Sequence, residues 1–86
     1  MMQYLADVST GLNALNIGHT FEDVGGDDTV LLVDNPDGSV SALSEDYVLG
    51  VYPNRESWEL SDQLDDFFED MYVEDAVRQI ARRHNG

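Results

Sequence analysis

The chain lacks both cysteine and lysine, and it has only two prolines among its 86 residues. Without cysteine there is no disulfide framework, no thiolate metal site and no cysteine nucleophile. No apolar run approaches the roughly 18 residues that a membrane-spanning helix requires. The first residues also lack the basic segment and long apolar stretch of a signal peptide. We therefore expect a protein of the cytoplasm.

Charge of one sign is abundant. The chain has 18 acidic residues against four basic ones, all of them arginine, which gives a formal net charge of −14. The segment 21–75 holds 17 of these acids and one base, Arg55. The other three arginines lie close to the C-terminus, after the last acid. Such a field repels nucleic acid and anionic membranes and attracts basic protein surfaces.

The apolar content of 42% is typical of a folded protein, and the length predicts one domain over residues 1–86. In the first 18 residues, leucines and a valine at 3–4–3 spacing predict a helix that ends at Gly18. Gly11 lies inside this pattern and costs about 1 kcal/mol relative to alanine. The stripe consists of Leu5, Val8, Leu12 and Leu15.

The middle of the chain predicts an antiparallel meander. The β-branched run 29–33 is followed by the turn sequence Asn-Pro-Asp-Gly at 35–38. Segments 39–44 and 47–52 supply two further strands, and 19–24 adds a possible edge strand. This gives three or four strands.

Two helices are predicted after Pro53. Ser57 is a suitable N-cap, and apolar residues at helical spacing follow it up to Met71. The apolar stripe shifts near Tyr72, so a second helix is expected over 72–84, with arginines in its last turns. The predicted fold is α+β: an N-terminal helix, a meander of three or four strands and two C-terminal helices.

The first of these predicted helices, 58–71, contains six acids and no base. At 100° per residue the apolar side chains take an arc of about 100° and the acids an arc of about 140° opposite them. The acids then form a row about 16 Å long, with neighbours about 5–6 Å apart. The row consists of Glu59, Asp62, Asp65, Asp66, Glu69 and Asp70.

A carboxylate row of this spacing is able to occupy the lysine and arginine sites that a protein uses for the DNA backbone. Loop acids at Asp27, Asp28, Glu45 and Asp46 would extend it. Trp58 has two interpretations, an exposed anchor in a partner's pocket or a side chain packed on the sheet. The acidic face likewise has two, since most charged helix faces are only solvated.

Other kinds of site find little support. The segment 34–45 begins with Asp and ends with Glu as an EF-hand loop does, but Pro36 and Gly38 are misplaced for calcium. Asp27 and Asp28 are read as solvated loop acids rather than as a cation site. His19 and His84 lack zinc-ligand spacing, and no nucleophile or phosphate-binding motif is present. We therefore expect no enzyme, no metal and no cofactor.

In its small size, extreme acidity and helix–meander–helix order, the chain resembles the phage-encoded anti-CRISPR proteins and related DNA-mimic inhibitors. The resemblance implies a non-enzymatic inhibitor that blocks the nucleic-acid-binding surface of a basic protein, such as a Cas or other defence nuclease, and that binds neither nucleic acid nor membrane itself. The alternative is a small structural or adaptor protein adapted to high salt. Twelve Asp, six Glu and no Lys suit that alternative equally well.

Overall fold

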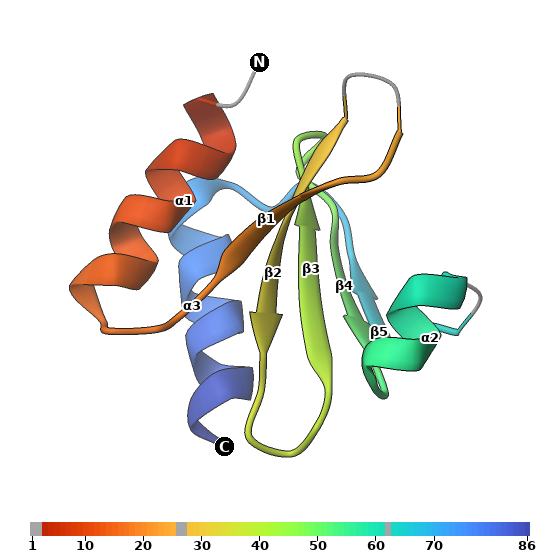
Figure 1. Ribbon diagram of the computed structural model, residues 1–86. Helices are drawn as coiled ribbons and strands as arrows, with labels where there is room; N and C mark the ends of the chain where they lie inside the picture. The colour runs from red at the N-terminus through yellow and green to blue at the C-terminus, as the bar shows by residue number, and fades with distance from the viewer. Residues whose placement is uncertain (1–2, 26–27, 62) are drawn as a thin grey trace.

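The computed structural model describes residues 3–25, 28–61 and 63–86. It is an α+β fold in which a five-stranded antiparallel sheet carries helices on both faces (Figure 1). Helices α1 (Gln3–Ala14) and α3 (Val73–Asn85) lie together on one face, and the short helix α2 (Arg55–Leu60) lies on the other. Among the described residues, no helix is both long and apolar enough to cross a membrane.

The sheet is a meander in which sequential strands are neighbours. Its strands are β1 (Thr20–Asp23), β2 (Thr29–Asp34), β3 (Val40–Ser44), β4 (Leu49–Tyr52) and β5 (Asp66–Phe68). The predicted strands and the turn at 35–38 are confirmed, and Gly38 accepts the positive φ of 94° that this turn requires. The sheet has five strands rather than the three or four predicted, because β5 pairs with β4.

The main core lies between the sheet and the helix pair. Leu5, Val8 and Leu12 of α1 are buried there, as are Leu31 and Leu43 of the sheet. Leu15, predicted to belong to the same stripe, is exposed. Helix α1 ends at Ala14, before the predicted Gly18, because Asn16 takes a left-handed conformation.

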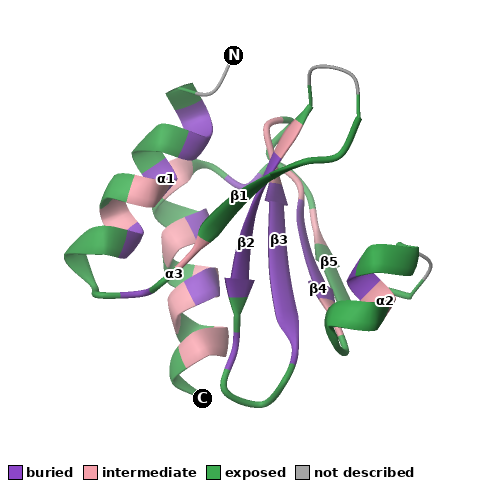
Figure 2. Cartoon of the chain, viewed as in Figure 1, coloured by how far each residue is buried: buried purple, intermediate pink, exposed green. Residues whose placement is uncertain are grey.

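A second, smaller core lies on the opposite face of the sheet. The alternate residues of β2 and β3 point there, so both strands are buried along most of their length (Figure 2). Trp58 of α2 covers this face with 8% of its surface exposed, and its ring lies 5.2 Å from that of Tyr52. Trp58 is therefore packed on the sheet and is not an exposed anchor.

The helix predicted over 58–71 is confirmed only as far as Leu60, within the short helix α2, and is wrong beyond it. Helix α2 begins after Asn54, whose side chain accepts a hydrogen bond from the Ser57 amide at 2.7 Å, so Asn54 rather than Ser57 is the N-cap. The helix ends at Leu60, where Ser61 adopts a left-handed conformation. Beyond it β5 alternates as a strand does: Phe68 packs against the main core, whereas Phe67 is 52% exposed.

Candidate functional site: an acidic groove lined by three tyrosines

The acids predicted to form one helical row are divided between two ends of the sheet. Glu59 lies on α2, Asp65 and Asp66 lie at the start of β5, and Glu69 and Asp70 follow its end. Asp27 and Asp62 lie outside the described residues. Phe67 and Phe68 of β5 therefore separate two acidic pairs that the predicted helix had placed on one face.

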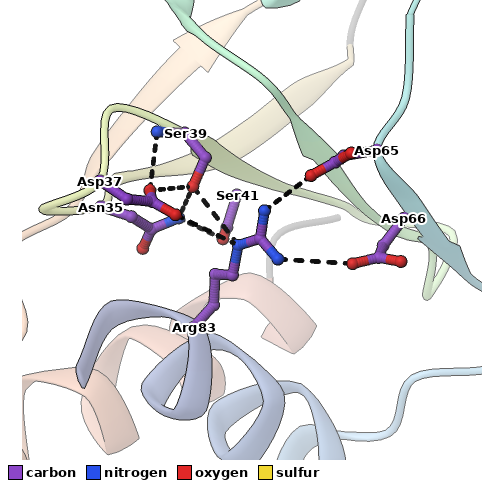
Figure 3. Close-up of polar contacts among 7 residues, drawn as sticks. All are labelled: Asn35, Asp37, Ser39, Ser41, Asp65, Asp66 and Arg83. Atoms are coloured by element: carbon purple, nitrogen blue, oxygen red, sulfur yellow. Dashed lines mark hydrogen bonds and ion pairs between the residues drawn. The ribbon is translucent and has the colours of Figure 1, made fainter. Parts of the chain in front are cut away.

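The first pair is engaged by Arg83 of α3 (Figure 3). The guanidinium lies 2.8 Å from Asp65 Oδ2 and 3.5 Å from Asp66 Oδ2, and its Nε lies 4.0 Å from Asp37 Oδ2. These contacts connect the C-terminal part of α3 to β5 and to the turn between β2 and β3. Asp65 and Asp66 thus already have a cationic partner within the chain.

Asp37 is held in place by the turn itself. Its carboxylate accepts hydrogen bonds from the Ser39 hydroxyl at 2.5 Å and from the Ser39 amide at 2.9 Å. These bonds, with a smaller contribution from Arg83, hold the pKa of the Asp37 carboxyl below its ordinary value. Buried Asn35 donates to the hydroxyls of Ser39 and Ser41 beneath it. The cluster therefore has a clear structural role.

The second pair lies at the other end of β5, where it meets another predicted acidic pair. The Met71 amide donates to the Tyr47 carbonyl at 2.8 Å, which joins the loop after β5 to the turn between β3 and β4. Glu69 and Asp70 immediately precede Met71, and Glu45 and Asp46 immediately precede Tyr47. Two acidic segments far apart in the sequence are thereby brought to one edge of the sheet.

Three tyrosines lie at this edge in a ladder of rings. The rings of Tyr4 and Tyr47 meet edge to face with centroids 4.4 Å apart, and the rings of Tyr47 and Tyr72 lie 5.9 Å apart. Tyr4 belongs to α1, Tyr47 to the β3–β4 turn and Tyr72 to the residue before α3. Three segments therefore contribute one ring each.

The rings line a surface groove of about 670 Å³. Tyr72 is 65% exposed there, whereas Tyr4 is buried. The other groove residues are mostly acidic or polar: Gln3, Asp7, Val73, Glu74 and Asp75. Three carboxylates thus line the groove, and the acidic pairs 45–46 and 69–70 directly precede Tyr47 and Met71 in the chain. We call this groove the acidic groove. It is lined by Gln3, Tyr4, Asp7, Tyr47, Tyr72, Val73, Glu74 and Asp75.

Tyr4 fastens the groove to the fold. Its hydroxyl donates a hydrogen bond to the Met71 carbonyl. Burial, with a smaller effect of Tyr47, raises the pKa of Tyr4 to about 12. The phenol therefore stays protonated well above neutral pH, and its hydrogen bond holds the buried ring against the chain at Met71.

The backbone at Tyr47 is in an unusual conformation. Its φ is 64°, in the left-handed region that bulky residues rarely occupy. This conformation turns the chain so that the Tyr47 ring reaches Tyr4 on one side and Tyr72 on the other. Strain of this kind persists only where the surrounding contacts hold it.

Sequence reasoning named acids next to this site and missed its tyrosines. A local signal exists, because Tyr47 follows Glu45-Asp46 and Tyr72 precedes Val73-Glu74-Asp75. Their proximity depends on pairing between the loop at 69–72 and the β3–β4 turn. That pairing follows from β5, which the helical interpretation had excluded.

The chain matches no protein-family model, no curated protein and no solved structure. Among the described residues, no group of three or more histidines and acids is placed to hold a metal ion.

Proposed function

We propose that this protein is a non-enzymatic binding protein. It docks the acidic groove and the neighbouring segments 45–46 and 69–70, together called its acidic edge, on the basic, nucleic-acid-binding surface of another protein. The observation that carries the proposal is that carboxylates of α1 and of the start of α3 line one groove, next to the hydrogen bond that joins the acidic segments 45–46 and 69–70. Arg78 pairs with Asp75 at this edge, at 3.1 Å. Carboxylates grouped in this way resemble the charge of a phosphate backbone more closely than an evenly mixed surface does.

The acids bound by Arg83 take a secondary part in this proposal. Asp65 and Asp66 are already paired, and Asp34 and Glu22 pair with Arg55 at 3.1 and 3.9 Å. The partners to test first are the defence nucleases that the resemblance to anti-CRISPR proteins implies.

Competition for duplex DNA tests this function. A fluorescent duplex is bound to each of a panel of purified guide-loaded Cas nucleases and restriction endonucleases, and the protein is added as competitor. We expect displacement from at least one nuclease, weakening as salt rises because the contacts are ionic. If the protein displaces DNA from none of the nucleases in the panel, the proposal is contradicted.

Two triple variants of equal charge locate the binding surface. The edge variant is Asp46→Asn, Glu69→Gln and Glu74→Gln, and the control is Asp28→Asn, Glu56→Gln and Glu59→Gln. All six side chains are exposed, and each set includes one glutamate in the first turn of a helix. We expect the edge variant to lose competition about tenfold or more and the control to change it by less than about threefold. Equal losses would mean that net charge alone is responsible.

The high-salt adaptor remains the alternative, since the excess of Asp over Glu and the absence of Lys favour it. On that reading the carboxylates serve solubility, and the fold melts at low salt and is restored by molar salt. A charge mimic stays folded at low salt and releases its partner as salt rises. Thermal unfolding followed by circular dichroism from about 10 mM to about 2 M salt separates the two, because screening at the upper end reduces the Debye length to about 3 Å or less.

A further inference from the structure

We propose that the acidic groove receives an arginine side chain of the basic partner, and that Tyr47 and Tyr72 stack against its guanidinium. The inference rests on the proposed function and names the chemical group that the groove would bind. It depends on the shape and charge of the groove rather than on the acidity of the chain as a whole.

Two exposed aromatic rings favour an arginine in the groove. Tyr47 and Tyr72 are both exposed and lie 5.9 Å apart with their planes inclined at 46°. Because both side chains are exposed, part of each ring is accessible to a third planar group. A guanidinium stacks on tyrosine faces by a cation–π interaction and is the cation found most often in such contacts.

The carboxylates of the groove also favour an arginine. Asp7 and Glu74 line the groove from α1 and α3, on elements separate from the Tyr47 turn. An arginine held on the rings would have carboxylates beside it for the paired N–H···O contacts that its planar fork favours. A lysine has a single ammonium group and fulfils this geometry less well.

The start of α3 opposes a cation, and the sequence compensates for it. The first turn of a helix carries partial positive charge, and Tyr72 provides no side-chain cap to the free amides. Glu74 and Asp75 lie in that turn and offset the dipole, while Arg78 pairs with Asp75. Glu74 then faces the groove as a carboxylate that can pair with the incoming guanidinium.

The groove is also large enough for an arginine side chain. A groove of about 670 Å³ holds more than one side chain, so an arginine with its flanking backbone fits. The groove is anchored at its buried side by Tyr4, whose hydroxyl is bonded to the Met71 carbonyl. An anchor residue in a partly preformed pocket is the usual way in which a few residues dominate an interface.

A peptide pair tests the proposal on the intact protein. The probe is acetyl-Gly-Arg-Gly-amide, and the control probe is the same peptide with neutral citrulline in place of arginine. Binding is followed by NMR through the ring and amide signals of the protein. We expect the arginine peptide to shift the Tyr47 and Tyr72 rings in a saturable way, with citrulline at least about fivefold weaker, since it keeps the shape and loses the charge. Equal binding of the two peptides, or shifts spread over all acidic residues, would overturn the proposal.

Matched variants locate the contact. Tyr72→Leu and Glu74→Gln alter the groove, whereas Phe21→Leu and Glu56→Gln change an exposed aromatic and an exposed first-turn acid elsewhere. We expect the groove variants to weaken the arginine peptide about three- to fivefold each and the controls to leave it unchanged. Tyr72 is largely exposed, so its replacement leaves the core intact. If the groove and control variants behave alike, the groove is not the site.

The proposed function and this inference fail in different ways. If the edge triple variant loses nuclease competition while Tyr72→Leu binds the arginine peptide as the unaltered protein does, the docking function stands and the arginine anchor is wrong. If the peptide binds the groove but no nuclease in the panel is displaced, the groove is an arginine site and the docking function is wrong.

Discussion

Gly11 of α1 lies directly against Val77 of α3. A Cβ atom added at Gly11 would come 2.8 Å from Val77 Cγ2, which is closer than two carbon atoms pack. Glycine in a helix normally destabilises it by about 0.5–1 kcal/mol relative to alanine. Here the absence of a side chain allows the two helices to approach, and this approach fixes the N-terminal residues of the two helices beside the groove.

Gly11→Ala is therefore expected to lower the free energy of unfolding by about 1–3 kcal/mol, the range for overpacking a core, rather than to raise it. Val77 is β-branched and adjusts poorly. Urea unfolding measures the change. In the pair Gly11→Ala with Val77→Ala, the second change should relieve the clash, so the two effects are not additive. Gly18→Ala, with no atom within 4 Å of the added Cβ, should be close to neutral. A stabilised Gly11→Ala would contradict the close helix approach.

The strands were predictable because their signals are local. The β-branched run 29–33, the turn at 35–38 and Pro53 each determine their own neighbourhood, and all are confirmed. The segment after Leu60 has a less decisive signal, because Leu64, Phe67, Phe68 and Met71 fit a helical stripe. The like-charged neighbours that this helix would carry oppose it. Pairing with β4 provides the alternative, through the amide of Asp65 and the Val51 carbonyl at 2.6 Å and through the register of Phe68 with Leu49.

The candidate site was predictable only in its charge. Glu45, Asp46, Glu69 and Asp70 were named from the sequence, but as parts of two separate regions. Their meeting depends on tertiary contacts, the bond from Met71 to Tyr47 and the ring contact of Tyr47 with Tyr4. No local pattern encodes contacts between residues so far apart in the chain.

Replacement of Arg83 tests whether the acids at the start of β5 depend on their cationic partner for the stability of the fold. Arg83→Gln removes the ion pairs with Asp65, Asp66 and Asp37 and leaves these carboxylates to repel one another. We expect a loss of about 1–2 kcal/mol in the free energy of unfolding at low salt, more than an isolated surface pair gives, because several charges share one cation.

Arg82→Gln is the matched control for this change, since it removes the same charge from the same last turn of α3. Both variants lose the favourable interaction with the helix dipole. The difference between them should shrink at about 1 M salt, where charges are screened over about 3 Å. Equal stability of the two variants at low salt would mean that the Arg83 cluster contributes nothing.

Alkaline pH tests the burial of Tyr4. Its pKa is raised from 10.0 to about 12, so between these values the unfolded chain loses the proton while the native protein keeps it. The stabilisation is complete below about pH 10 and is lost as pH rises toward about 12. Absorbance of tyrosinate at 295 nm should show a tyrosine that titrates well above pH 10, and Tyr4→Phe should remove this step. Burial also raises the pKa of Tyr52, so the Tyr52→Phe variant distinguishes the two transitions. If the late step persists in Tyr4→Phe and vanishes in Tyr52→Phe, it belongs to Tyr52 on the opposite face of the sheet, and the prediction for Tyr4 is wrong.

Tyr47 gives the clearest test of the groove's backbone. With φ at 64°, any residue other than glycine pays a steric penalty of about 1–2 kcal/mol. Tyr47→Gly should therefore be more stable than Tyr47→Ala by about 1 kcal/mol in urea unfolding, although glycine is ordinarily the less stable of the two. Tyr52 has an ordinary negative φ in β4, and there Tyr52→Gly should be less stable than Tyr52→Ala. Both Tyr47 variants lose the ring and should bind the arginine peptide equally weakly, because the ring contacts the guanidinium while the backbone only orients it. If alanine proves the more stable residue at position 47, the turn does not hold the left-handed conformation that brings the three rings together.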